Sequence, residues 1–158
     1  MRKNMRVGCG IAVAIFLGLC VLIQLPILFF QSNPPVVQEP KWDSPQTRAL
    51  AKRACFDCHS NETNWTWYTR VPPSSLLTTL DVIRGRRNLN FSEWGVAPRG
   101  GEGEEGEGGE GGEGGGKAGE LIQNGEMPPG NYLMMHPEAR LTNQEKLQLI
   151  AGLQNSLR

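Results

Sequence analysis

Cys55-Phe56-Asp57-Cys58-His59 is the stretch around which the rest of this chain is organised. C-x-x-C-H is the attachment signature of a c-type haem. Two thiols at this spacing can add to the two vinyl groups of one porphyrin, and a histidine directly after the second thiol can turn its imidazole onto the iron. The motif therefore predicts one covalent haem c per chain, attached through Cys55 and Cys58, with His59 as the proximal iron ligand.

Paired cysteines also occur in disulfides, in redox dithiols and in metal sites completed by other ligands. The adjoining His59 favours haem over these alternatives. A zinc site would need a second pair of ligands, and the other two cysteines, Cys9 and Cys20, lie in an apolar segment far from the motif. Only His136 remains as a further nitrogen donor.

The chain has 158 residues, enough for one modest domain once the amino-terminal segment is set aside. Its formal net charge of +0 conceals a local asymmetry, because six of the 16 acidic residues lie in one glycine-rich run. No basic stripe interleaved with aromatic residues points to nucleic acid, so we expect no nucleic-acid partner.

Residues 7–30 are apolar apart from Gln24, and about 20 such residues are enough to cross a bilayer as a helix. Arg2, Lys3 and Arg6 precede them, which by the positive-inside rule makes residues 1–6 a cytoplasmic tail. The sequence thus predicts a single-pass cell-membrane protein whose C-terminal domain is on the periplasmic, extracytoplasmic side.

A cleaved signal peptide is the main alternative, but residues 29–33 offer no small-x-small cleavage site. Cys20 only loosely resembles a lipoprotein processing site, because the bulky Leu19 precedes it. Residues 31–41 contain Pro34, Pro35 and Pro40, and this composition predicts a short, stiff tether.

Residues 42–158 are expected to form the exported domain. Ser44-Pro45 predicts a helix start, and this first helix runs into Cys55. A second helix is expected over residues 75–88 and a short one over residues 117–124, stopped by Gly125. The second helix carries apolar residues at helical spacing, namely Leu76, Leu77, Leu80 and Ile83.

A capping box formed by Thr142 and Glu145 predicts a closing helix. Its expected apolar face would dock against the first helix and the haem edge. The residues expected on that face are Leu147, Ile150, Leu153 and Leu157.

Three large aromatic residues, Trp65, Trp67 and Tyr68, follow the motif in a polar loop. They suit packing on a flat apolar cofactor whose edge meets solvent, and the alternative is that they complete a small core. Three arginines end the second helix, where they suit the helix dipole, although one of them could instead pair with a haem propionate. These are Arg84, Arg86 and Arg87.

Residues 100–116 contain only glycine and glutamate. This composition cannot bury apolar area, so it predicts a flexible, disordered loop at residues 99–117. A calcium site is a weak alternative, because the regular alternation of oxygen ligands with a structured turn is absent.

The motif supplies one axial ligand of the haem iron, so the ligand at the sixth coordination position is still to be assigned. A thioether at this position raises the reduction potential. Four side chains compete: Met127, Met134, Met135 and His136. Met127 ranks first, because the prolines that follow it stiffen its loop, His136 ranks second, and an open position ranks third. The alternative for Met134 and Met135 is adaptable core packing.

The order of helix, C-x-x-C-H, loop, helix, Met-Pro-Pro and amphipathic helix resembles a small class I cytochrome c domain. More closely, residues 42–153 resemble the family of small membrane-anchored haem-binding domains that a C-x-x-C-H motif defines. The blocks that carry this resemblance are residues 55–63 with Trp65, Trp67 and Tyr68, then residues 90–94, 125–129 and 135–141.

The resemblance implies a mostly α-helical domain around one haem, preceded by a single transmembrane helix. In the proteins that this chain resembles, haem is attached outside the cytoplasm, which agrees with the predicted export. Between Trp94 and Glu120 the chain departs from the family, which usually has a charged helix where this chain has glycine and glutamate.

The sequence is compatible with three functions. The leading one is electron transfer to an unidentified redox partner protein by a six-coordinate haem. The second is a haem-based gas or redox sensor, or a binding module, whose sixth ligand is labile. The third is an enzyme such as a peroxidase, but His136 alone is thin support for a distal acid–base group, so no enzymatic activity is predicted.

Overall fold

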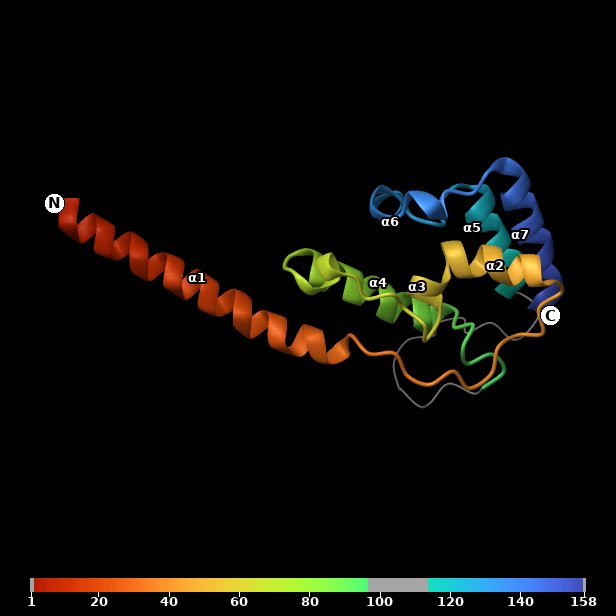
Figure 1. Cartoon of the computed structure of the whole chain (residues 1–158), viewed down its shortest axis with the longest axis horizontal. Coiled ribbons are helices and arrows are strands. Elements are labelled where there is room, and N and C mark those ends of the chain that lie inside the picture. The colour runs from red at the N-terminus through yellow and green to blue at the C-terminus, as the bar shows by residue number, and fades with distance from the viewer. Residues whose placement is uncertain (1, 97–113, 158) are drawn as a thin grey trace. The chain divides into compact units, whose positions relative to one another are not determined.

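The computed structural model describes residues 2–96 and 114–157, and it leaves side chains undescribed at positions 2–8, 23, 26, 28 and 114. In this part of the chain the regular elements are helices, apart from one isolated bridge between Gln38 and Glu93. The prediction of a mostly helical fold is therefore confirmed (Figure 1). The α-helices are α1 (Arg2–Phe30), α2 (Pro45–Ala54), α3 (Phe56–His59), α4 (Ser74–Asn88), α5 (Gly114–Gln123), α6 (Gly130–Met135) and α7 (Asn143–Ser156), and the 3₁₀-helices are η1 (Trp67–Arg70) and η2 (Pro137–Ala139).

Across residues 2–96 and 114–157, no helix combines the length and the apolar character needed to cross a membrane. The predicted span at residues 7–30 is therefore unsupported by the structure.

The chain divides into two compact units. The first comprises Met1–Ser32 and Trp65–Asp81, and so contains α1, η1 and the first half of α4. Polar side chains join these elements: Ser75 Oγ donates to Gln24 Oε1 over 2.7 Å, and Gln31 Nε2 donates to Thr79 Oγ1 over 3.0 Å. Ile27 of α1 is buried within this unit.

The helix predicted over residues 75–88 is confirmed as α4, but its first leucines do not face the protein interior. Ser75 and Thr79 are buried, whereas the leucines of the same two turns are exposed. The reason is that the two hydroxyl groups bind the glutamine side chains of α1, and this places the opposite side of α4 outward. The exposed leucines are Leu76, Leu77 and Leu80.

The second unit comprises Asn33–Asn64 and Val82–Arg158. Its helix starts follow the sequence signals: Ser44 Oγ accepts from the Thr47 backbone N–H over 3.1 Å, with Pro45 at the first helical position. Thr142 and Glu145 form the predicted capping box at the start of α7. Both predicted helix starts are confirmed.

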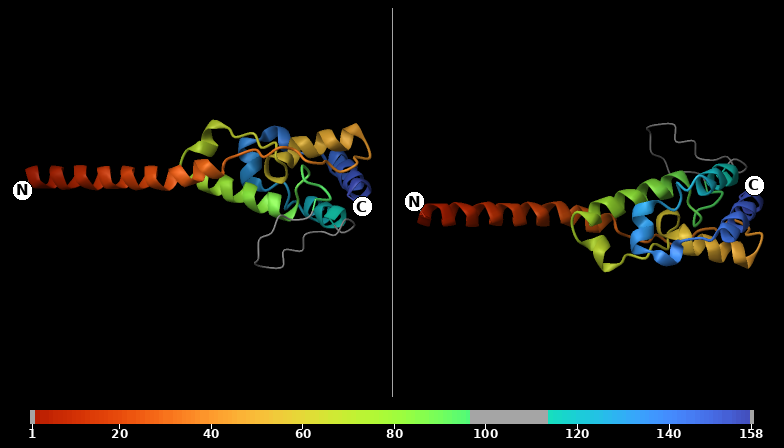
Figure 2. Two further views of the ribbon diagram at one scale, coloured as in Figure 1. Left: turned by 90° about the horizontal axis from the view of Figure 1, so that it is seen from below. Right: turned by 90° about the horizontal axis from the view of Figure 1, so that it is seen from above.

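The core of the second unit lies where α7 packs against α2 and α5. α5 and α7 lie side by side in both views of Figure 2. A Cβ on Gly152 of α7 would overlap the Thr47 side chain, so this glycine permits the close approach of α2. The buried core residues are Leu50, Ala51, Phe56, Phe91, Ile122, Leu149, Leu153 and Leu157.

The inward face of α7 differs from the prediction at one position. Leu147 is 70% exposed, and Leu149 is fully buried in its place. The buried set on α7 is Leu149, Gly152, Leu153 and Ser156, which is a continuous helical stripe. The sequence pattern alone did not distinguish two leucines that are two residues apart.

Most of the predicted glycine and glutamate loop lies outside the described residues. Its last part, residues 114–117, is helical, because α5 begins at Gly114 rather than at Lys117. α5 ends at Gln123, and Gly125 follows with φ 75°, a left-handed conformation that suits glycine. The predicted stop at Gly125 is confirmed.

Candidate functional site

The C-x-x-C-H motif forms one tight turn at the end of α2. Cys55 closes α2 and opens α3, and its carbonyl oxygen accepts from the backbone N–H groups of Cys58 and His59 over 3.2 and 2.9 Å. The two thiols and the imidazole therefore come from a single turn of rigid backbone. Neither Cys55 nor Cys58 forms a disulfide bond.

Burial and, to a smaller extent, the neighbouring Cys58 raise the pKa of the Cys55 thiol to about 12. A redox dithiol depends on a cysteine whose pKa is lowered, because the thiolate is the nucleophile. In these surroundings Cys55 lacks the lowered pKa on which a nucleophilic redox thiol depends. They keep this thiol protonated at neutral pH.

His59 is held in one tautomer. Its Nδ1 lies 3.1 Å from the backbone carbonyl oxygen of Leu89, and since a carbonyl only accepts, Nδ1 carries the proton. The lone pair is then on Nε2. Burial lowers the pKa of the His59 imidazole, while the carbonyl oxygens of Leu89 and Gly85 oppose this shift. A neutral imidazole oriented by a backbone carbonyl is the usual state of a metal-ligating histidine.

The second half of α4 packs directly behind the motif. A Cβ on Gly85 would overlap the Cys58 carbonyl oxygen and lie 2.9 Å from the Cys58 carbonyl carbon. Only a residue without a side chain allows the two backbones to approach this closely. Gly85 therefore fixes the position of the turn that carries Cys58 and His59.

Arg86 holds the segment that follows the motif. Its guanidinium donates to the Ser60 carbonyl oxygen over 2.8 Å, to Thr63 Oγ1 over 2.9 Å and to Asn33 Oδ1 over 3.0 Å. These three acceptors give Arg86 a structural role that the sequence did not predict. Arg84 and Arg87, the other members of the cluster, are exposed.

A second connection joins the motif to α6. Tyr132 Oη donates to Asp57 Oδ2 over 2.8 Å, and Asp57 Oδ1 accepts from the backbone N–H of Asn64 over 2.9 Å. Burial and the Asp57 carboxylate raise the pKa of the Tyr132 hydroxyl. Sequence reasoning missed both residues. The only feature of the sequence that could have pointed to Asp57 is its position inside the motif.

The candidate sixth ligands differ strongly in their surroundings. Met127 is partly buried, packs against the core and lines a pocket of about 230 Å³ with Pro128 and Leu133. His136 is 8% exposed, its Nδ1 lies 2.9 Å from Glu138 Oε1, and its ring stacks on Tyr132 at 4.1 Å.

Met134 is 77% exposed and Met135 is also exposed, so the alternative of core packing is wrong for both. The structure thus places Met127 and His136, and not the other two methionines, in protein surroundings that could hold a ligand in one orientation.

The predicted aromatic cluster lies in the other compact unit. Trp65, Trp67 and Tyr68 belong to the first unit, whereas the motif belongs to the second. The rings of Trp67 and Tyr68 meet edge to face at 5.9 Å. Their packing on the cofactor therefore stays a prediction.

Among the described residues, no group of three or more histidine, cysteine, aspartate or glutamate side chains could hold a metal ion. The donor set at the motif instead fits haem. It offers one imidazole with a lone pair on Nε2, and two thiols on the same turn that are not joined to each other.

Fold and site together define the class as a small helical domain with a C-x-x-C-H turn backed by a helix. The family model described as "Haem-binding domain" matches residues 18–155. The chain therefore belongs to this family of haem-binding domains. No curated protein and no solved structure matches the chain.

Proposed function

We propose that this chain carries one covalently bound haem c and transfers electrons, with its haem domain held at the outer face of a membrane. The observation that carries the haem assignment is the tautomer of His59, which leaves Nε2 as the ligand atom on the same turn as two thiols. The haem supplies the one-electron chemistry. The chain supplies attachment, axial ligation and burial.

Covalent attachment needs no oxidant. Each thiol would add across one vinyl double bond of the haem, so that sulfur bonds to one carbon and the thiol hydrogen goes to the other. Cys55 and Cys58 would provide the two sulfurs, and the Leu89 carbonyl orients His59. Phe56, between the cysteines, is 2% exposed and anchors the turn in the core.

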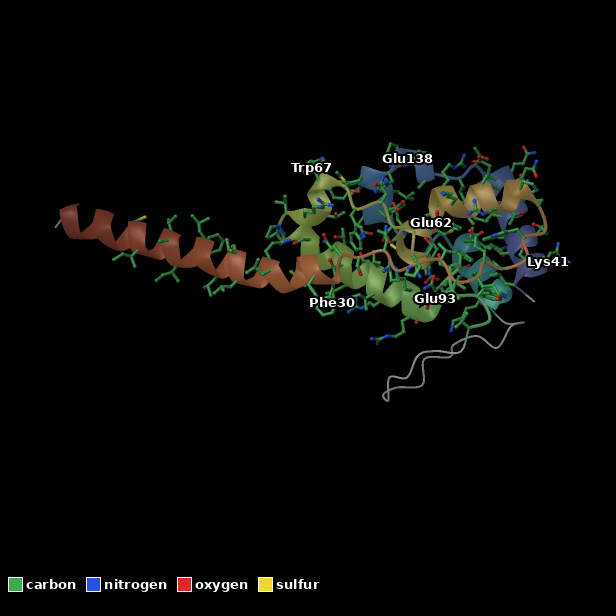
Figure 3. The ribbon with its side chains drawn as sticks, turned by 60° about the horizontal axis from the view of Figure 1, so that its bottom comes forward. Phe30, Lys41, Glu62, Trp67, Glu93 and Glu138 are labelled. Carbon is green, nitrogen blue, oxygen red and sulfur yellow. The ribbon has the colours of Figure 1, made fainter. Side chains whose placement is uncertain are left out.

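Membrane attachment is supported by the side chains of α1. Figure 3 shows side chains on more than one side of α1. At the helical angle of about 100° per residue, its exposed apolar residues surround the helix axis, and they are Ile11, Val13, Ile15, Phe16, Leu17, Leu19, Val21, Leu22 and Leu25. A helix that is apolar all round needs an apolar environment on every side, which one partner helix cannot provide. We therefore propose that the apolar part of residues 7–30 anchors the chain, with the basic residues 2, 3 and 6 on the cytoplasmic side.

The proposed haem attachment is tested by a pyridine haemochrome spectrum on the full chain, produced with a covalent haem-attachment system. We expect a c-type spectrum from the unaltered protein, and its complete loss in the Cys55→Ser, Cys58→Ser double variant. The matched control is Cys9→Ser, Cys20→Ser, which removes the same number of thiols from α1 and should retain the spectrum. Loss of haem in both double variants, or in neither, would contradict the assignment.

A sensor with a labile sixth ligand is the second candidate. The observation that favours it is the pocket beside Met127, which leaves space next to the thioether and has Arg140 and Lys146 in its lining. A small ligand could occupy that space if Met127 moved. Binding of carbon monoxide to the ferrous protein separates the two candidates: slow, partial binding supports electron transfer, and rapid, full binding supports the sensor.

We propose Met127 as the sixth ligand in the electron-transfer form. Met127→Ala is then expected to open the sixth position, accelerate carbon monoxide binding and lower the midpoint potential by part of the roughly 0.8 V range that axial ligands cover. Met134→Ala, on the exposed side of α6, is the control and should change neither quantity. If His136→Ala opens the position and Met127→Ala does not, the ligand is His136.

A further inference from the structure

The first compact unit has an apolar surface of a kind that is unusual for a protein surface in contact with water. In the first two turns of α4, serine and threonine are buried and the leucines are exposed, with Leu77 at 58%. A surface helix in water shows the reverse arrangement, because burial of apolar area is the main source of its stability. Buried polar groups together with exposed large apolar ones are the informative departure from that rule.

The exposed surface continues beyond α4. Trp67 in η1 is 75% exposed and Val71 is also exposed, and both come within ten residues before the first of these leucines in the chain. Trp67 lies at the outside of this segment in Figure 3. Arg70 is exposed between them. We call this set the η1–α4 surface: Trp67, Val71, Leu76, Leu77 and Leu80.

Hydrogen bonds within the same unit fix the η1–α4 surface beside the end of α1 (Figure 2). Gln24 accepts from Ser75, and Gln31 donates to Thr79 and to the Thr69 carbonyl oxygen. Gln24 and Gln31 are seven residues apart, which is roughly 10 Å along a helix. The surface therefore lies alongside the last two turns of α1 and not beyond its end.

The position of the η1–α4 surface along α1 predicts how deep this surface would lie in a bilayer. If the apolar part of α1 is in a bilayer and ends near Phe30, the level of Gln24 and Ser75 is about 10 Å below that end. Interfacial segments bury their apolar side chains about 5–10 Å into the boundary between headgroups and acyl chains. Tryptophan is enriched at that boundary, and an arginine there can pair with lipid phosphate.

We propose that the η1–α4 surface is a second, interfacial membrane contact, which dips into the outer leaflet beside α1 and binds phospholipid. This inference rests on the membrane attachment proposed above. Lipid is favoured over a second copy of the chain because the surface belongs to the same unit as a helix that is apolar all round, which the same bilayer would surround. The contact would hold the chain by two segments, and so restrict rotation of this unit about the axis of α1.

The test is photolabelling of the full-length holoprotein in vesicles of phosphatidylethanolamine and phosphatidylglycerol. One phospholipid carries a diazirine near the glycerol end of an acyl chain, and a second carries it at the chain terminus. Trypsin then separates residues 7–41 from residues 71–84 and from residues 147–158. We expect the shallow probe to label residues 71–84, both probes to label residues 7–41, and neither to label residues 147–158, although Leu147 is exposed there.

The matched variants are Leu77→Glu, Leu80→Glu in α4 and Leu147→Glu in α7. All three positions are exposed, so the fold should survive, which circular dichroism checks. The α4 double variant is expected to lose most labelling of residues 71–84 while residues 7–41 keep theirs. Leu147→Glu should change neither the labelling of residues 71–84 nor the labelling of residues 7–41.

The outcomes separate the two proposals. If residues 7–41 are unlabelled, the membrane attachment itself is wrong. If residues 7–41 are labelled and residues 71–84 are not, only the interfacial contact is wrong, and chemical cross-linking of the vesicles would then show whether a second copy covers the surface.

Discussion

Replacing Gly85 by alanine is expected to destabilise the protein and to reduce covalent haem attachment, although the same change usually stabilises a helix. Gly85 lies in the interior of α4, where alanine is ordinarily better than glycine by about 1 kcal/mol. Here the new Cβ would overlap the backbone carbonyl group of Cys58. That group cannot rotate away as a flexible side chain could.

The expected cost of this overlap is about 1–3 kcal/mol, the usual range for overpacking. α4 and the motif turn would have to separate, and the turn carries Cys58 and His59. We therefore expect a lower melting temperature by circular dichroism, by about 2–4 °C for each kcal/mol lost in a chain of this length. The haem-to-protein ratio should fall as well.

Gly116→Ala is the matched control. Gly116 is also in a helix, α5, but a Cβ there would meet nothing within 4 Å. Its melting temperature should be unchanged or slightly higher, and its haem content unchanged. If Gly85→Ala behaves in the same way as this control, the close packing of α4 on the motif is wrong.

Phe91→Ala is expected to give the largest loss of stability, about 3–5 kcal/mol. Phe91 is 1% exposed, stacks on Phe56 at 5.5 Å and contacts Trp42 at 5.3 Å between ring centroids. Its backbone N–H donates to the His59 carbonyl oxygen over 2.8 Å. Truncating it leaves a cavity directly behind the motif.

A net stability of about 5–15 kcal/mol is typical of a domain, so this loss should unfold a measurable fraction of the protein at 37 °C. Chemical denaturation followed by circular dichroism measures the free energy of unfolding. Leu147→Ala, at an exposed position of α7, is the control and should stay within about 0.5 kcal/mol of the unaltered protein. Equal losses in the two variants would mean that Phe91 is not in the core.

Local signals in the sequence determined the helix ends. Ser44 and Thr142 cap their helices as predicted, and Gly125 takes a positive φ after α5, because each of these effects depends only on residues within one turn. The motif also indicated its own chemistry, since Cys55, Cys58 and His59 are neighbours in the chain. Family membership over residues 18–155 agrees with the haem prediction.

Tertiary structure decided which side of each helix faces inward and what surrounds the motif. The leucines of α4 are exposed because Ser75 and Thr79 bind glutamines that are about 50 residues away in the chain. Leu149 replaces Leu147 in the core because α7 packs on two helices at once.

The supports of the motif likewise depend on long-range contacts. The Leu89 carbonyl, Gly85 and Tyr132 act on His59, Cys58 and Asp57 from 27 to 75 residues away in the chain. A carbonyl oxygen and a glycine carry no distinguishing side chain, so a sequence pattern has nothing to mark them. The sequence by itself determined the chemistry of the motif, and only the tertiary structure decided how that motif is oriented, because orientation depends on backbone groups brought together by folding.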